Sequence, residues 1–204
     1  MSIKDAAPET ILGKTIVALT LISLIAYAHY NIEAAKTSEV VELTAETTDA
    51  FKASEDINNA QVYFTSQDGV KICELSAGGD LWRCSGNEWN YIGTSPHKLG
   101  KHLRRCVWAH PITNNTLHII FEDVDLGSKV EGFYGIIDGT STEDPGRVDF
   151  VVSVGDVDVY DGSTVNPGLK EFEFETGGAS DIEFKVFTNK DVRRHFCFDA
   201  WASN

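Results

Sequence analysis

The sequence predicts a mainly β protein, an antiparallel β-sandwich or jelly roll preceded by one N-terminal transmembrane α-helix. Three observations carry this prediction. Several short runs beyond residue 60 alternate apolar and polar residues with the period of two that a half-buried strand requires. Turns rich in Gly, Pro and Asp separate these runs, and no amphipathic helical pattern lies between them. An apolar stretch near the N-terminus has the length of a membrane span.

The first expected element is that apolar stretch, ILGKTIVALTLISLIAYAHY at residues 11–30, whose only charge is Lys14. About 20 apolar residues in a helix cross about 30 Å of hydrocarbon. The residues AYA at 26–28 also fit the small-x-small rule for signal-peptidase cleavage, so a cleaved signal peptide is the alternative. Two acids in residues 1–10 weaken the basic region that a signal peptide needs. We therefore expect a retained single-pass anchor in the cell membrane, with an inner tail at 1–10 and a periplasmic or extracellular C-terminal domain.

The next two segments differ in composition. Residues 31–60 are acidic and contain neither Pro nor Gly, which predicts a solvated linker. Residues 61–95 contain short strand-like runs broken by Asp-Gly, Gly-Gly and Ser-Gly, the dipeptides of tight turns. This segment is expected to form a small β-meander packed on the sandwich, with Trp82 and Trp89 inside it or exposed as a sugar platform.

The main sandwich is expected over residues 96–204, where the alternation is clearest. In LKEFEFET, for example, two Phe residues alternate with three Glu residues, the pattern of a strand with one buried face. The residues expected to face the core are Leu117, Ile119, Phe121, Val148, Phe150, Val152, Val154, Phe172, Phe174, Ile182, Phe184, Val186, Phe196 and Phe198.

The four cysteines all follow the apolar stretch, with no CxxC pair and no zinc-ligand spacing. An even number of cysteines in an exported domain favours disulfides. Three connectivities are possible, and free thiols are the alternative. The preferred pairing joins Cys73 to Cys84 within a hairpin and Cys106 to Cys197 between the first and last strands of the main sandwich.

The net charge of −14 argues against nucleic acid as a partner, because phosphates require a basic surface. One basic segment interrupts the acidic sequence, SPHKLGKHLRRCVWAHP. It is either a solvated loop or a docking patch for anionic headgroups of the lipid bilayer or for an acidic partner. The residues of this patch are Lys98, Lys101, Arg104 and Arg105.

Four stretches of the second half resemble the NPCBM-type modules, which are galactose-binding-like β-sandwich domains attached to many glycoside hydrolases. The matching elements are Asp125-Leu126-Gly127, Asp138, Val148–Tyr160 and Phe198–Ala202. The resemblance covers about residues 106–204 and implies a non-catalytic jelly roll, often linked to carbohydrate. The family has no sharply defined ligand motif, so the resemblance carries over no binding residue.

No catalytic constellation stands out in the sequence, and we expect no enzyme. GxSxG, GxxxxGK[ST] and HExxH are all absent. The histidines lack metal-pair spacing, and the one at 118 is expected on the outer face of its strand. The histidines are His29, His97, His102, His110, His118 and His195.

Acidic turns at the ends of the predicted strands are the only candidate metal site. Calcium takes six to eight oxygen ligands, and carboxylates supply them. No spacing of the EF-hand kind supports a calcium site here, so ordinary acidic turns are the alternative, and no other cofactor is indicated. The candidate calcium ligands are Asp123, Asp125, Asp138, Glu143 and Asp144.

Two functions fit these observations. In the first, the chain is an accessory subunit: its helix packs in an integral membrane protein complex, and the exported sandwich braces that complex. In the second, it is a membrane-tethered or secreted carbohydrate-binding module. The second function would be favoured if two tryptophans were exposed beside one groove. The candidate stacking residues are Trp82, Trp89, Trp108 and Trp201.

Overall fold

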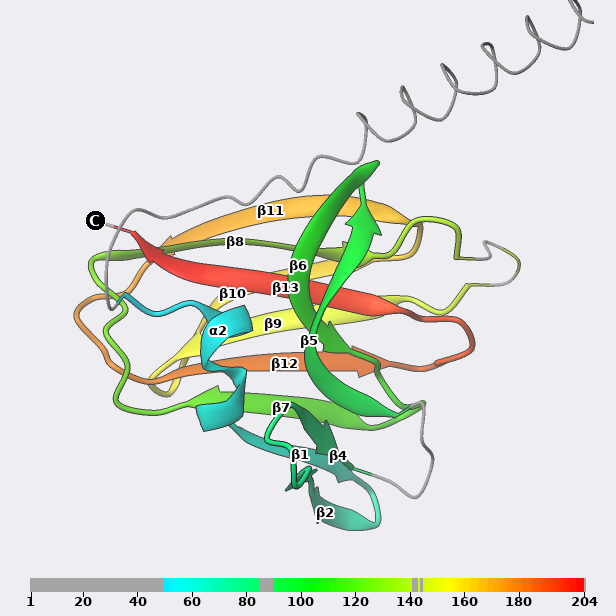
Figure 1. Cartoon of the computed structure of the whole chain (residues 1–204), viewed down its shortest axis with the longest axis horizontal. Coiled ribbons are helices and arrows are strands. Elements are labelled where there is room, and N and C mark those ends of the chain that lie inside the picture. Colours follow the sequence, from blue (N-terminus) through cyan, green and yellow to red (C-terminus); the bar gives the residue numbers. More distant parts are fainter. Residues whose placement is uncertain (1–49, 85–89, 141–142, 144, 204) are drawn as a thin grey trace, which may run out of the picture. The chain divides into compact units, whose positions relative to one another are not determined.

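A computed structural model describes residues 50–84, 90–140, 143 and 145–203, which fold as a sandwich of two antiparallel sheets (Figure 1). One short helix, α2 (Ala53–Asp56), and a 3-10 turn, η1 (Ile57–Asn59), precede the strands. The strands are β1 (Gln61–Ser66), β2 (Gly69–Ile72), β3 (Glu74–Leu75), β4 (Leu81–Arg83), β5 (Tyr91–Leu99), β6 (His102–Ala109), β7 (Thr116–Phe121), β8 (Lys129–Ile136), β9 (Val148–Val154), β10 (Val157–Thr164), β11 (Gly168–Glu175), β12 (Ile182–Thr188) and β13 (Phe196–Ser203).

The two sheets have the strand orders β10-β9-β12-β7-β1-β2 and β11-β8-β13-β6-β5-β4-β3. The predicted mainly β fold is therefore confirmed. The inward residues of β7, β9, β12 and β13 that the alternation predicted are all buried. Phe150 of β9 lies at the centre, with its ring centroid within 5.6 Å of those of Phe172, Phe196 and Phe198. Phe174 is only half-buried, because β11 is an edge strand.

The predicted linker at 31–60 extends too far, because its last residues belong to the sandwich. Phe51, Ala53 and Ile57 are buried, and the backbone N–H of Ala202 donates to the carbonyl of Phe51 over 2.9 Å. Helix α2 lies beside β13 and next to β5 and β6 (Figure 1). One helical turn is too short to produce a periodic pattern, so the sequence alone did not reveal it.

The predicted meander at 61–95 is also divided differently. Strand β1 pairs with β7, with Gln61 opposite Ile120, and so belongs to the six-stranded sheet. Strands β3 and β4 extend the other sheet through β5. The turns that join β1 to β2 and β3 to β4 were read correctly, and the Ser-Gly turn at 85–86 lies outside the described residues. Which distant strand each run joins is decided by tertiary pairing.

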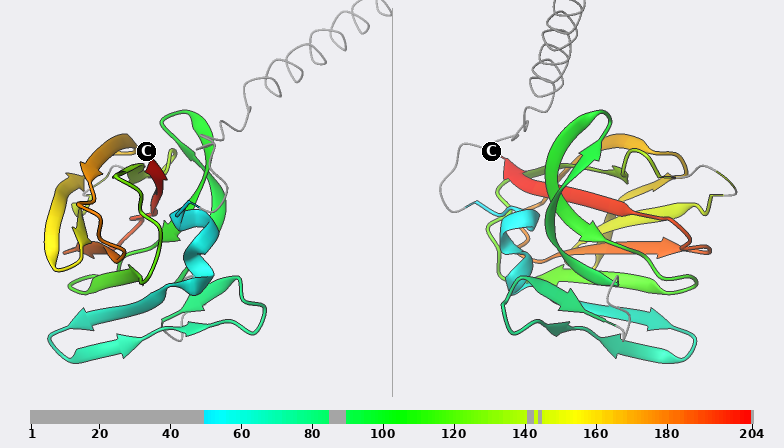
Figure 2. Two further views of the ribbon diagram at one scale, coloured as in Figure 1. Left: turned by 90° about the vertical axis from the view of Figure 1, so that its left-hand side faces the viewer. Right: turned by 45° about the vertical axis from the view of Figure 1, so that its right-hand side comes forward.

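The β5–β6 hairpin separates from its sheet and covers the outer face of β13. Only two residue pairs join β6 to β13, Cys197 with Trp108 and Phe198 with Val107. Beyond them the hairpin crosses in front of β13 (Figure 2), and β13 is consequently buried on both faces. The turn residues Gly100 and Lys101 have φ of 58° and 75°, the left-handed values of a tight two-residue hairpin turn.

The β5–β6 hairpin is attached to the rest of the sandwich by hydrogen bonds to Asp138 and by a disulfide to β13. The backbone N–H groups of Gly100 and Lys101 donate to the carboxylate of Asp138 over 3.2 and 2.6 Å. The disulfide Cys106–Cys197 ties β6 to β13, and the disulfide Cys73–Cys84 links β2 to the end of β4. Both disulfides are the preferred pairs from the sequence.

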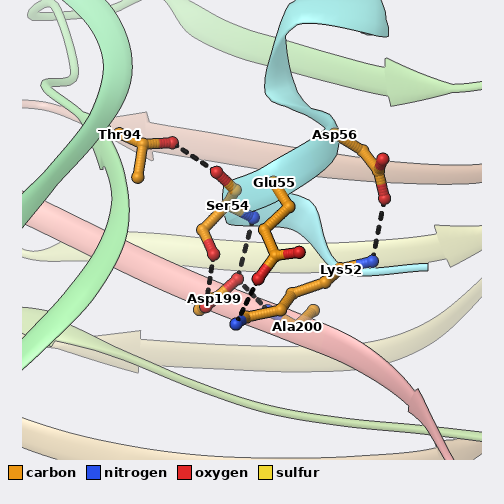
Figure 3. A network of polar contacts seen from close by, with 7 residues as sticks. All are labelled: Lys52, Ser54, Glu55, Asp56, Thr94, Asp199 and Ala200. Atoms are coloured by element: carbon orange, nitrogen blue, oxygen red, sulfur yellow. Dashed lines mark hydrogen bonds and ion pairs between the residues drawn. The ribbon is translucent and has the colours of Figure 1, made fainter. Parts of the chain in front are cut away.

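A buried carboxylate attaches α2 to β13 (Figure 3). Asp199 is 3% exposed and accepts hydrogen bonds from Ser54 N, Ser54 Oγ and Ala200 N over 2.9, 2.8 and 3.0 Å. Thr94 of β5 donates its hydroxyl to the Ser54 carbonyl over 2.6 Å. Burial is the main cause that raises the pKa of Asp199, to about 6.

Within the part of the chain that the structure describes, no helix is long and apolar enough to span a membrane. The expected inner tail at 1–10, anchor at 11–30 and linker up to residue 49 lie outside the described residues.

Candidate binding site

A hollow of about 340 Å³ opens between the end of β6 and the loop that joins β12 to β13. Trp108 and His110 come from β6 and the residue after it, and His195 directly precedes β13. Because Trp108 pairs with Cys197 in antiparallel register, the residues that flank this pair, His110 and His195, lie side by side. The lining residues are Trp108, His110, Asp191, Val192, Arg193 and His195, and we call this the Trp108 hollow.

Trp108 is the centre of a group of aromatic and imidazole rings. The indole lies 4.8 Å from the ring of His97, 5.1 Å from that of His195 and 5.9 Å from that of His110. Tyr91 stacks on it at 5.9 Å with an interplanar angle of 19°. The side chain is 9% exposed, and its Nε1–H has no hydrogen-bond partner among the described residues. Of these rings, Trp108, His110 and His195 line the hollow and form one wall, and Tyr91 and His97 of β5 pack against Trp108.

The three imidazoles beside Trp108 are neutral at pH 7. Burial, assisted by the neighbouring His195, lowers the pKa of His110 to about 4. Burial also lowers the pKa of His97, and burial followed by the charge of Arg194 lowers that of His195. A neutral imidazole has one N–H donor and one acceptor nitrogen. The wall is therefore both aromatic and able to make hydrogen bonds in either direction.

The opposite rim is a loop fixed from two sides. The carboxylate of Asp191 accepts from Thr113 N over 3.1 Å, and Asp191 N donates to Thr113 Oγ1 over 3.0 Å. The buried Arg194 donates from Nη1 to the Val165 carbonyl over 2.7 Å. Between them Arg193 is exposed, with a φ of 56°. The fixed ends position Arg193 at the crest of the loop.

A second hollow, of about 350 Å³, lies on the outer face of β8, β11 and β13. Lys129 bridges two of its glutamates, with Nζ at 2.9 Å from Glu131 and 2.7 Å from Glu173. The guanidinium of Arg104 lies over the Phe133 ring, 5.1 Å from its centroid. The lining residues are Glu131, Gly132, Phe133, Glu171, Phe172, Glu173 and Trp201, and we call this the acidic hollow.

The four candidate tryptophans have separate positions. Trp82 packs against the core and donates from Nε1 to the Ile57 carbonyl over 2.8 Å, which is a structural role. Trp89 lies outside the described residues. Trp108 and Trp201 are each 9% exposed and line two different hollows. The arrangement that would favour the carbohydrate-binding function, two exposed tryptophans beside one groove, is not found among the three tryptophans that the structure describes.

The basic patch is not one continuous surface. Lys98, Lys101 and Arg105 are exposed, but Arg104 is half-buried because it stacks on Phe133. Neighbouring residues of a strand point to opposite faces, so Arg104 and Arg105 cannot share a surface. Docking of headgroups or of an acidic partner stays a prediction for the three exposed cations.

The structure does not bring the candidate calcium ligands together. Asp123 and Asp125 precede β8 and Asp138 follows it, so a strand of 8 residues, about 26 Å long, separates them. The Asp138 carboxylate already holds the hairpin turn, and Asp125 Oδ1 accepts from Gly127 N over 3.0 Å. Asp144 lies outside the described residues, Glu143 is exposed, and the described part of the chain contains no cluster that could hold a metal ion.

His118 lies on the outer face of β7, as expected, but it is largely covered. Its Nδ1 is 2.6 Å from the carboxylate of Glu183, its Nε2 is 2.9 Å from Thr65 Oγ1, and its ring stacks on Tyr63 at 4.6 Å. These contacts give it a structural role in the six-stranded sheet.

The sequence alone did not group His97, His110 and His195, because 13 to 98 residues separate them along the chain. One signal was available. A disulfide between Cys106 and Cys197 in antiparallel strands brings the residues that follow one cysteine close to the residues that precede the other. This reasoning places Trp108 near His195, as the structure shows.

No protein-family model matches the sequence, and no curated protein matches it. Among solved structures, a CBM51 module of Clostridium perfringens GH95, solved in complex with methyl-galactose, is 14% identical, with a TM-score of 0.39 over 80% of this chain and 94% of that one. A TmCBM61 module in complex with β-1,4-galactotriose is 12% identical, with a TM-score of 0.32 over 76% and 95%. A two-domain structure of C. perfringens ZmpB, CBM51-2 with INT, is 9% identical, with a TM-score of 0.36, and the chain covers 25% of it. Likenesses this low do not decide what the Trp108 hollow binds.

Proposed function

We propose that this chain is a non-catalytic carbohydrate-binding module and that the sugar binds in the Trp108 hollow. The observation that supports this most is that the indole of Trp108 and the neutral imidazoles of His110 and His195 line one open hollow. The proposal corresponds to the second of the two functions that the sequence suggests.

The chemistry of the wall suits a pyranose. Sugar rings present C–H faces that pack on flat aromatic rings, and their hydroxyl groups both donate and accept hydrogen bonds. The neutral imidazole of His195, which lines the hollow, offers both kinds of hydrogen-bonding atom next to the indole of Trp108. The volume of about 340 Å³ is near the lower end for ligand sites, which suits one or two sugar rings.

Replacing Trp108 by alanine is expected to weaken glycan binding at least about fivefold, because stacking on an aromatic ring contributes about 1 kcal/mol or more. Binding of the full chain to an immobilised glycan array measures this, in a detergent without a sugar headgroup. The matched control is Trp201→Ala, since Trp201 is equally exposed and lines the acidic hollow.

The Trp201→Ala control distinguishes a loss of the binding site from a general loss of stability. We expect Trp201→Ala to keep the binding profile of the native chain. If both variants lose binding equally while far-ultraviolet circular dichroism shows them folded, or if Trp108→Ala binds as the native chain does, the sugar does not bind in the Trp108 hollow.

We also propose that residues 11–30 are retained and tether this module to the membrane. The intact mass of the native protein, purified from membranes in mild detergent, tests the tether: a full-length chain is expected. A chain that begins at His29 would show that the AYA sequence is cleaved. Co-purification of the full-length chain with a membrane complex in fixed stoichiometry would favour the accessory-subunit function instead.

A further inference from the structure

Arg193 brings a guanidinium without a partner to the rim of the Trp108 hollow. Its side chain is exposed and lines the hollow, and among the described residues it forms no hydrogen bond and no ion pair. The nearest carboxylate along the chain, that of Asp191, accepts the backbone N–H of Thr113 instead. The Arg193 charge is therefore available to a ligand.

The backbone at Arg193 is held in an unfavourable conformation. Its φ of 56° lies in the left-handed region, which glycine and asparagine adopt far more readily than arginine. The loop cannot relax easily, because Asp191 is bonded to Thr113 on one side and Arg194 is buried on the other. Strained residues of this kind concentrate at binding sites, where the surrounding structure maintains them.

The two charged side chains that line the hollow are Arg193 and Asp191, and Arg194, the residue after Arg193, is buried. Arg193 and Arg194 are cationic, Asp191 is anionic, and His97, His110 and His195 are neutral at pH 7. The whole chain has a formal net charge of −14. Because Asp191 is bonded to Thr113, the exposed guanidinium of Arg193 is the charge that a ligand in the hollow meets, and it attracts an anionic group.

We infer that the Trp108 hollow selects sugars that carry a carboxylate, with the carboxylate bound by Arg193 and the sugar ring against Trp108. This inference rests on the proposed carbohydrate-binding function. A guanidinium binds a carboxylate through two parallel N–H donors, which fixes its orientation as well as its position. Uronic and sialic acids present such a carboxylate at the edge of a ring that can stack.

The acidic hollow differs from the Trp108 hollow in the sign of the charges that a ligand would meet. Three glutamates line it, Lys129 bridges two of them, and the guanidinium of Arg104 lies over the Phe133 ring. An anionic sugar placed there would meet like charges, which disfavour binding. Selection for an acidic ligand should therefore depend on Arg193 and not on the aromatic rings that both hollows contain.

Isothermal titration calorimetry of the full chain tests the inference. The ligands are the methyl glycosides of glucuronate and galacturonate and N-acetylneuraminic acid, compared with methyl glucoside and methyl galactoside. We expect at least one acidic sugar to bind ten times more tightly than the neutral sugars, with an advantage that shrinks as salt increases. Arg193→Gln should remove the advantage, and Arg105→Gln, which removes an exposed charge outside the hollow, should keep it.

The outcomes separate the inference from the function beneath it. Neutral sugars that bind as tightly as the acidic ones, or an advantage that survives in Arg193→Gln, would overturn the inference and leave the binding of sugar intact. Failure of all five sugars to bind, together with a blank glycan array, would overturn the proposed function and the inference with it. Acetate that binds as tightly as the acidic sugars would show that the hollow holds a carboxylate without requiring a sugar ring, which also contradicts the inference.

Discussion

Replacing both Cys106 and Cys197 by alanine is expected to lower the free energy of unfolding by about 4 to 5 kcal/mol. The disulfide joins residues 91 positions apart, and closing a loop of that length restricts the unfolded chain strongly. Denaturant unfolding of the full chain without reductant, followed by tryptophan fluorescence, measures the loss.

The second disulfide is a matched control inside the same domain. Cys73 and Cys84 are 11 positions apart, so their replacement is expected to cost about 3 kcal/mol. In the same experiment, tryptophan fluorescence also reports on the β5–β6 hairpin, because the Cys106–Cys197 bond holds the hairpin that carries Trp108 and His97. Equal losses for the two pairs would contradict the dependence on loop length.

Replacing Asp199 by alanine is expected to destabilise the protein by about 3 kcal/mol at pH 7. The change leaves Ser54 N, Ser54 Oγ and Ala200 N without their acceptor in a buried position, and each such buried group costs roughly 1 kcal/mol or more. Asp199→Asn keeps the oxygen that accepts both N–H groups and turns an amide N–H₂ toward the Ser54 hydroxyl. Asparagine should therefore be far better tolerated than alanine.

The same carboxyl gives a pH dependence with a defined sign. Burial raises the pKa of Asp199 from 3.8 to about 6, so the folded state binds the proton more tightly than the unfolded state. Its contribution to stability is full below about pH 4 and is lost as the pH rises through 6, by roughly 3 kcal/mol in total. Asp199→Asn lacks this contribution.

Unfolding free energies of the native chain and Asp199→Asn between pH 4 and pH 8 measure it. The comparison is needed because Glu183 and Asp158, whose pKa values are lowered by hydrogen bonds, contribute with the opposite sign in both proteins. We expect the stability of Asp199→Asn relative to the native chain to rise from pH 4 to pH 7. Parallel curves for the two proteins would contradict a raised pKa at Asp199.

The alternation of apolar and polar residues along short segments correctly predicted which side chains of a strand are buried. The alternation in RVDFVVSVGD and DIEFKVFT correctly gave the buried faces of β9 and β12, because a side chain on a strand points either to the core or away from it. The number of cysteines and the predicted compartment favoured disulfides, and the pairing preferred among three is the one that forms. The membrane anchor at 11–30 rests on the same kind of local evidence and stays a prediction.

The candidate site was predicted only in part. Trp108 was named as a stacking residue, but so were Trp82, whose indole bonds to the Ile57 carbonyl, and Trp201, which lines the acidic hollow. A tryptophan can pack in the core or stack on a ligand, so its role depends on the residues that surround it in the fold. The proposed calcium ligands lie at opposite ends of β8, which the sequence also did not reveal.

The sequence by itself determined a β-sandwich with its inward faces, since period-two burial is a property of short segments, and it gave a preference among three disulfide pairings. Only the tertiary structure decided that β1 joins β7, that residues 50–60 pack on β13, and that the β5–β6 hairpin folds over the sheet. It also decided which rings surround Trp108. These contacts join residues up to about 150 positions apart, and their free energy comes from burial and hydrogen bonds that exist only once both segments are in place.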